Sequence, residues 1–220
     1  PNIGFYYEPL DVAPRVVTRE ELGIRPSAKA FWCAQSLFKY LPQHDEVFPR
    51  ITREAGDCQF VFIRHTRAAA VTALFETRLE NAFRAAGLES SDHCVFLDPM
   101  DMSRFTAASA QCDAMLDSIE WSGGNTTLEA LAQDLPVVTF QGALMRGRVS
   151  AGMLRMMGMP ETIAESLDGY VALAVRMARD STFRAALKVR IAKDKHRLYR
   201  DRASVAALED FISRVVREHA

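Results

Sequence analysis

The sequence lacks most of the features that would place it in a specialised class of protein. Its 220 residues include only four cysteines, Cys33, Cys58, Cys94 and Cys112, without a Cys-x-x-Cys pair. This argues against a disulfide framework or a paired-cysteine zinc site and favours buried, reduced thiols. No apolar run approaches the roughly 18 residues that a membrane-spanning helix needs, and the first residues lack a signal-peptide profile. We therefore expect a soluble, cytoplasmic globular protein.

Charge and length exclude further classes of protein. The formal net charge is −1, so neither a basic surface for nucleic acid nor an acidic disordered tail is indicated. Hydrophobic residues make up 49% of the chain, enough for a substantial core in one large or two small domains. The chain begins with Pro1 rather than methionine, which suggests a piece of a longer protein.

Strand-like and helix-like segments alternate along the chain. The predicted strands cover residues 28–33, 58–64, 95–97, 113–117 and 136–140. The predicted helices cover residues 42–55, 68–87, 101–110, 149–157, 170–178, 183–195 and 204–216, with another starting after the glycines at 123–124. Such alternation predicts an α/β fold, a Rossmann-like, doubly wound parallel sheet followed by C-terminal helices. Residues 1–26, rich in proline, are predicted to be a connector from a preceding part of the protein, and residues 27–220 the domain itself.

The most informative stretch runs from Trp121 to Leu131, where a glycine pair leads into an amphipathic run. It predicts a loop that becomes a helix N-terminus, a place where free backbone N–H groups and the helix dipole favour an anion. Gly123 and Gly124 would let a ligand approach the backbone, and two threonine hydroxyls follow. Glu129 is expected in the first helical turn, where its carboxylate could accept hydrogen bonds from a ribose diol. The alternative is an ordinary helix cap.

In a doubly wound sheet, ligands bind beyond the carboxyl ends of the strands. Four segments with candidate chemistry should meet there, namely Lys39, His65, Pro99 and residues 118–125. The sequence therefore predicts one ligand site at this edge.

Several separated motifs resemble one family in order and spacing. They are Phe31 with Phe38-Lys39-x-x-Pro42, Asp113-x-x-Leu116-Asp117, Gly124-Asn125-Thr126-Thr127-x-Glu129-Ala130-Leu131 with Pro136-Val137-Val138-Thr139, and Gly142 with Arg148-Val149. From about Glu20 to Ala220 the chain is similar to the C-terminal catalytic half of the SPINDLY-type O-linked N-acetylglucosamine transferases. Members of that family carry tetratricopeptide repeats in longer chains.

The resemblance implies a GT-B glycosyltransferase that uses UDP-N-acetylglucosamine to modify protein serine and threonine hydroxyls, without a cofactor or a metal. Lys39 matches the lysine that meets the diphosphate of the nucleotide sugar and would be catalytic. Nucleotide-sugar contacts are implied for Gln35, Ser36, Gly123, Gly124, Asn125, Thr126, Thr127 and, at the ribose, Glu129. Arg148 also matches a family residue, although its role does not follow from the resemblance.

The chain also departs from the family. Phe105 stands where many relatives have histidine, so its ring could pack on a base but not donate a hydrogen bond. Met145 likewise replaces a histidine that is frequent in bacterial relatives. Cys33-Ala34-Gln35 replaces an asparagine-rich loop, which leaves the choice of sugar and base open. Because the acceptor-binding half is not in this chain, we expect it to bind the nucleotide sugar without turning it over.

Two other functions fit the same residues. A nucleotide-sugar epimerase would need carboxylates and histidines around the sugar, and His65 and Asp117 are the candidates. A degenerate transferase domain could instead serve as a nucleotide-dependent interaction module. A repeat of about 34 residues in the upstream sequence would favour a protein-modifying transferase.

Overall fold

Parallel strands form the centre of the structure, a computed structural model that describes residues 4–13 and 15–219. In that part of the chain one sheet has six strands in the order β3-β2-β1-β4-β5-β6, and each neighbouring pair is parallel. The strands are β1 (Lys29–Trp32), β2 (Cys58–Ile63), β3 (Cys94–Leu97), β4 (Ala114–Leu116), β5 (Val137–Phe140) and β6 (Ile163–Ala164). The predicted Rossmann-like α/β fold is confirmed.

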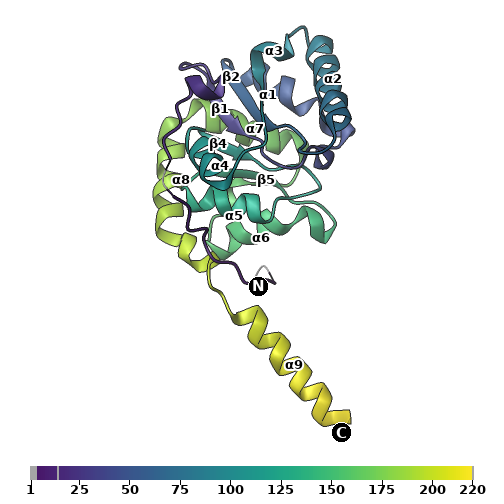
Figure 1. Ribbon diagram of the computed structural model, residues 1–220, viewed down its shortest axis with the longest axis vertical. Coiled ribbons are helices and arrows are strands. Elements are labelled where there is room, and N and C mark those ends of the chain that lie inside the picture. The colour runs from purple at the N-terminus through teal and green to yellow at the C-terminus, as the bar shows by residue number, and fades with distance from the viewer. Residues whose placement is uncertain (1–3, 14, 220) are drawn as a thin grey trace.

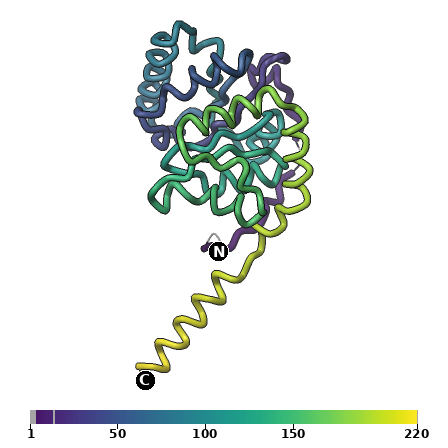
Figure 2. The backbone as a smooth tube through the Cα atoms, turned by 180° about the vertical axis from the view of Figure 1, so that it is seen from behind, coloured from purple at the N-terminus to yellow at the C-terminus, as the bar shows by residue number. Residues whose placement is uncertain are grey.

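Helices cover both faces of the sheet (Figures 1 and 2). The α-helices of the described residues are α1 (Val47–Ala55), α2 (Ala69–Ala85), α3 (Ser90–His93), α4 (Met102–Ala110), α5 (Asn125–Ala132), α6 (Val149–Met156), α7 (Leu167–Arg179), α8 (Ser181–Asp194) and α9 (Ala203–His219), of which α9 does not lie on the sheet. Helix α1 packs against α7, and α4 packs against α5. Because the sheet is buried between these layers, its strands consist almost entirely of apolar residues.

The prediction of a continuous helix from Pro42 to Ala55 was wrong. Residues Pro42–His44 form a single 3₁₀ turn, and α1 begins only at Val47. Between them, Asp45 accepts two hydrogen bonds from Arg78 of α2, at 2.6 and 2.8 Å, which fixes the chain in a turn. Strand β6 and helix α3 were not predicted, because each is too short to show a periodic pattern.

Strands β1 and β4 lie side by side at the centre, with Phe31 opposite Ala114 and Trp32 opposite Met115. From β1 the chain adds β2 and β3 on one side, and from β4 it adds β5 and β6 on the other. The loops that leave β1 and β4 therefore diverge, and such a switch point is where open α/β sheets bind ligands.

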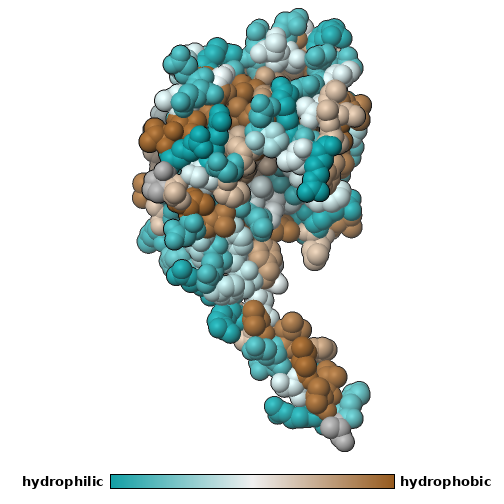
Figure 3. All heavy atoms as spheres, viewed as in Figure 1, coloured by the Kyte–Doolittle hydropathy of each residue, from teal (hydrophilic) through white to brown (hydrophobic). Residues whose placement is uncertain are grey.

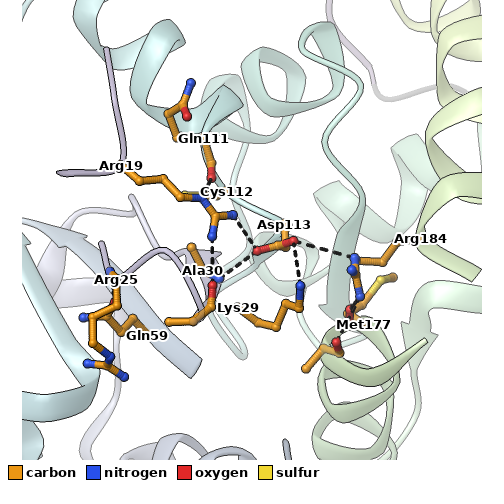
Figure 4. A network of polar contacts seen from close by, with 12 residues as sticks. Arg19, Arg25, Lys29, Ala30, Gln59, Gln111, Cys112, Asp113, Met177 and Arg184 are labelled. Atoms are coloured by element: carbon orange, nitrogen blue, oxygen red, sulfur yellow. Dashed lines mark hydrogen bonds and ion pairs between the residues drawn. The ribbon is translucent and has the colours of Figure 1, made fainter. Parts of the chain in front are cut away.

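At the opposite, amino edge of the sheet, a carboxylate is surrounded by cations (Figure 4). Asp113 accepts hydrogen bonds from the Arg19 guanidinium at 2.8 Å and the Ala30 backbone N–H at 2.9 Å. The Lys29 ammonium and the Arg184 guanidinium lie 4.0 and 3.8 Å from its other oxygen. This cluster ties the N-terminal segment and α8 to the sheet, so we interpret it as structural.

The N-terminal segment packs on the domain without regular secondary structure apart from a 3₁₀ turn at Glu20–Leu22. Val17, Leu22 and Ile24 are buried, and the carbonyl of Tyr7 accepts a hydrogen bond from the Arg200 N–H at 2.9 Å. Residues 1–3 and 14 of the predicted connector, and residue 220, lie outside the described residues. A domain boundary at residue 26 stays a prediction.

Helix α9 projects away from the domain and carries an apolar stripe (Figures 1 and 3). The exposed apolar residues of this stripe are Leu208, Phe211, Ile212 and Val216. No helix within residues 4–13 and 15–219 is both long enough and apolar enough to span a membrane.

The four cysteines are free, as predicted. Cys33, Cys58 and Cys112 are buried and Cys94 is partly buried. Burial raises the pKa of each thiol, for Cys58 to about 11. Thiols in such surroundings are chemically inert.

Candidate functional site

The loop that follows β1 is organised by a buried tyrosine. The Tyr40 hydroxyl accepts a hydrogen bond from the Gln35 N–H at 3.3 Å and donates one to the Cys33 carbonyl. A short 3₁₀ turn at Leu37–Lys39 completes the loop. As a result, Gln35 and Lys39 both face the loop that leaves β4.

A hydrogen-bonded bridge joins these two loops. The Lys39 ammonium donates to the Gln35 side-chain oxygen at 3.0 Å, and the Gln35 side-chain nitrogen donates to the Thr126 hydroxyl at 2.6 Å. Burial lowers the pKa of Lys39, while the nearby Asp117 carboxylate opposes that shift. The structure thus brings Lys39, Gln35 and Thr126 together at the switch point of the sheet.

The buried Asp117 carboxylate holds the glycine loop through hydrogen bonds. One of its carboxylate oxygens accepts from the Gly123 N–H at 2.7 Å, and the other accepts from the Ser122 and Thr139 hydroxyls, each at 2.8 Å. Burial raises the pKa of this carboxyl, and these hydrogen bonds act in the opposite direction. The Tyr170 hydroxyl of α7 also donates to the Asp117 carbonyl at 2.8 Å. These bonds hold the loop in place from within the protein.

The two glycines of the loop have different surroundings. A Cβ on Gly123 would lie 2.2 Å from the Gln35 side-chain nitrogen and 2.4 Å from the Thr127 hydroxyl, so a larger residue would displace these side chains. A Cβ on Gly124 would meet nothing within 4 Å. Gly124 is the N-cap of α5, and no side chain caps this helix end; the Thr127 N–H donates to the Gly124 carbonyl at 3.1 Å.

The hydroxyl of Thr127 points into the protein. It lies 2.8 Å from the Ser150 hydroxyl of α6, and Ser150 in turn lies 2.8 Å from the Ser122 hydroxyl. All three residues are buried. These bonds attach the start of α5 to α6, and a contact between Thr127 and a ligand stays a prediction.

The remaining predicted contacts lie around this centre. Ser36 and Asn125 are exposed at the two loops. A depression lined by residues 34–37 and 63–66 opens beside Ser36. Phe105 is 9% exposed and packs edge-on against Trp32, with ring centroids 5.1 Å apart, so little of its ring face is left for a base. Its stacking role stays a prediction.

The prediction that Glu129 lies in the first helical turn was wrong. Helix α5 begins at Asn125, which places Glu129 in the second turn, where the helix dipole has less effect. Its carboxylate accepts a hydrogen bond from the Tyr7 hydroxyl at 3.3 Å. Contact with a ribose stays a prediction.

The two residues that an epimerase would use are already engaged. The His65 Nδ1 atom accepts from the N–H groups of Arg67 and Ala68, at 3.2 and 3.1 Å, ahead of helix α2. Asp117 is 1% exposed and bonded within the loop. The Asp117 carboxylate is thus enclosed by the loop, whereas the bonds of His65 involve its Nδ1 atom alone.

Arg148 and Met145 belong to the loop after β5. The Arg148 Nε donates to the Gly142 carbonyl at 2.7 Å, which closes this loop, whereas Met145 is 85% exposed. Among residues 4–13 and 15–219, no group of three or more His, Cys, Asp or Glu side chains could hold a metal ion. Metal independence stays a prediction.

Sequence reasoning missed the supports of the site. Tyr40 and Ser150 were not predicted to take part. Ser122 was predicted only as one residue of the segment 118–125, and Asp117 only as part of the family motif and as a candidate carboxylate of an epimerase. The available signal was a carboxylate at the end of a buried strand, just ahead of a glycine loop. Ser150 gave no signal, because it reaches the loop from a different helix.

Comparison with known proteins now identifies the family. The sequence profile described as Glycosyl transferase family 41 matches residues 8–206. The chain belongs to glycosyl transferase family 41. Its predicted resemblance to the SPINDLY-type transferases is thereby confirmed.

Curated relatives in family 41 match over limited stretches. The probable UDP-N-acetylglucosamine–peptide N-acetylglucosaminyltransferase SPINDLY of Petunia hybrida is 32% identical over 77 residues, which cover 35% of this chain and 8% of that protein. The UDP-N-acetylglucosamine–peptide N-acetylglucosaminyltransferase of Giardia intestinalis is 26% identical over 129 residues, 56% of this chain and 8% of that protein. The matched part is thus a small fraction of these relatives.

Solved structures show the same fold. A mutant of the Thermobaculum terrenum O-GlcNAc transferase superposes with a TM-score of 0.78 and 25% identity, covering 96% of this chain and 39% of that one. The sucrose-phosphate synthase of Thermosynechococcus elongatus superposes with a TM-score of 0.62 at 13% identity, covering 99% of this chain and 51% of that one. The second likeness concerns the fold alone.

Proposed function

We propose that this chain is the nucleotide-sugar-binding part of a glycosyltransferase that transfers N-acetylglucosamine from UDP-N-acetylglucosamine to serine and threonine hydroxyls of proteins. One observation carries the proposal: Lys39 and the glycine loop meet at the switch point of the sheet and are joined through Gln35. A compact cation beside a helix N-terminus that no side chain caps suits a diphosphate. The names of the family 41 relatives supply the sugar, the base and the peptide acceptor.

In the proposed reaction, the bond between the sugar C1 and the β-phosphate oxygen breaks while the acceptor hydroxyl oxygen bonds to C1. Negative charge moves onto the departing phosphate oxygen, and the Lys39 ammonium stabilises it there. The hydroxyl proton must pass to a base. Asp117 is buried and bonded within the loop, so this base is expected from the acceptor-binding part of a longer protein.

Titration calorimetry on this chain tests the binding part of the proposal. Both UDP and UDP-N-acetylglucosamine should bind, and a chelator should leave the affinity of each unchanged. Lys39→Ala should weaken both ligands, whereas Lys193→Ala, a matched change of an exposed lysine on α8, should leave them unchanged.

Three results would contradict parts of the proposal. A failure of the wild-type chain to bind any nucleoside diphosphate would overturn it. Tighter binding of guanosine diphosphate sugars would overturn the choice of base. Binding that appears only with magnesium or manganese would overturn metal independence.

A further inference from the structure

We propose that Gln35 is a positioning residue, which aligns Lys39 and Thr126 as hydrogen-bond donors toward the diphosphate without touching the nucleotide sugar itself. The inference rests on the proposed function, since it concerns the same anion site. It differs from the expectation drawn from the family resemblance, in which Gln35 contacts the nucleotide.

The orientation of the Gln35 amide follows from its neighbours. A lysine ammonium has only donors, so the amide atom that faces Lys39 at 3.0 Å must be the oxygen. The amide nitrogen then faces Thr126 at 2.6 Å, and the threonine hydroxyl oxygen must accept. The amide orientation is thus fixed without reference to any ligand.

This orientation leaves two groups ready to donate. Because the Thr126 oxygen accepts from Gln35, the hydroxyl proton of Thr126 is left to point elsewhere. Lys39 uses one of its three N–H groups on Gln35, and within residues 4–13 and 15–219 its ammonium has no other hydrogen-bond partner. A diphosphate is an acceptor only, so it requires donors of this kind.

Burial indicates that Gln35 lies beneath the site rather than in it. The residue is 2% exposed, while Lys39 and Thr126 are both partly exposed. Its amide nitrogen occupies the space that a side chain on Gly123 would fill. A ligand at the loop surface would therefore meet Lys39 and Thr126 before it met Gln35.

The backbone of Gln35 is also hydrogen-bonded. The Gln35 N–H donates to the Tyr40 hydroxyl at 3.3 Å, and Tyr40 is buried. The glutamine side chain is long enough to reach from the β1 loop to α5. Its amide oxygen accepts from Lys39, and its amide nitrogen donates to Thr126. Methionine has a similar length but provides neither group.

Double-mutant cycles test the inference, with UDP as the probe. Gln35→Met should weaken UDP binding about tenfold in the wild-type chain, the scale of one coupled hydrogen-bonded contact. In chains that already carry Lys39→Met together with Thr126→Val, the same change should alter affinity by less than about twofold. Gln43→Met, at an exposed glutamine outside the bridge, is the matched control and should have no effect.

The outcomes separate three possibilities. An equal loss of affinity in both backgrounds would mean that Gln35 touches the nucleotide, and no loss in the wild-type background would mean that it does nothing; either would overturn the inference. Should Gln35→Met lower the melting temperature, Gln35→Asn repeats the cycle with an amide too short to span both partners. A wild-type chain that does not bind UDP would overturn the proposed function, and the inference with it.

Discussion

Tyr7 donates a hydrogen bond to Glu129 across 3.3 Å, and this contact joins the N-terminal segment to helix α5 beside the candidate site. Burial raises the pKa of the Glu129 carboxyl, while the bond from Tyr7 opposes the shift. On the other side of the contact, burial and the neighbouring carboxylate raise the pKa of Tyr7 to about 12. Tyr7 therefore remains a donor at every physiological pH.

Replacing Glu129 tests whether its carboxylate meets a ribose. Glu129→Gln should weaken UDP binding by about 1–3 kcal/mol, since an amide oxygen is a poorer acceptor for diol hydroxyls than a carboxylate. Binding of inorganic pyrophosphate, which has no ribose, should stay unchanged. Calorimetry measures the affinity for both ligands. An equal loss of affinity for UDP and for pyrophosphate would show that Glu129 acts on the loop instead. Tyr7→Phe serves as the control for the lost contact between Tyr7 and Glu129.

Lys39 should act mainly on the rate of the proposed reaction. In a longer form of the enzyme that turns over, Lys39→Ala should lower kcat by about 10²–10³, because its interaction is strongest when charge reaches the departing oxygen. Affinity for UDP-N-acetylglucosamine should fall much less. Lys39→Arg should restore activity only in part, since a planar guanidinium does not fit the place of a compact ammonium.

The competing account is a lysine that only attracts anions. It predicts a loss of affinity at unchanged kcat, and added salt would then reproduce the effect of the mutation. Separate measurements of kcat and of nucleotide-sugar affinity distinguish the two accounts. An unchanged kcat at saturating UDP-N-acetylglucosamine would remove Lys39 from the chemistry.

The lowered pKa of Lys39 predicts a dependence on pH. If Lys39 binds the diphosphate as proposed, it does so as the charged ammonium, so the affinity for UDP should fall as the pH rises through a value below the usual range for lysine. Stability should change in the opposite direction: in that window the unfolded chain holds more protons than the folded chain, so the free energy of unfolding rises with pH. Titrations and denaturation from neutral to alkaline pH measure both trends. Lys39→Met, which removes the titrating group, should abolish both.

The glycine pair offers a matched comparison. Gly123→Ala should disrupt the bridge, because its Cβ would lie 2.2 Å from the Gln35 nitrogen, and UDP affinity should fall at least about tenfold. Gly124→Ala, whose Cβ would meet no protein atom within 4 Å, should leave the bridge intact and lower affinity only through direct contact with the ligand. An unchanged affinity of Gly123→Ala would show that the contact with Gln35 is unimportant.

The fold could be predicted because its signals are local. Short apolar runs predicted β1, β2, β3 and β5, which are four to six residues long in the structure. Glycines predicted the ends of several helices. Gly87 and Gly158 indeed adopt positive φ values of 69° and 71°. The start of α1 was missed because it depends on Arg78, a residue from a different helix.

The site was predictable only in outline. Loop positions after β1 and β4 follow from the order of elements, so the region of Lys39 and Gly123 could be predicted. The direction of each side chain could not: Thr126 faces Gln35 while its neighbour Thr127 faces Ser150. That difference depends on where α6 packs, and no pattern within the loop contains it.

The pairing of β1 with β4 has a consequence for how the chain folds. Phe31 and Ala114 are neighbours in space but far apart in sequence, and the segments between them must form β2 and β3 first or be closed as one long loop. Contacts of this kind form slowly. Lys39 follows β1 and Gly123 follows β4, so a bound diphosphate would link the two strands of this pairing. Its effect should appear as slower unfolding, with little change in the rate of folding.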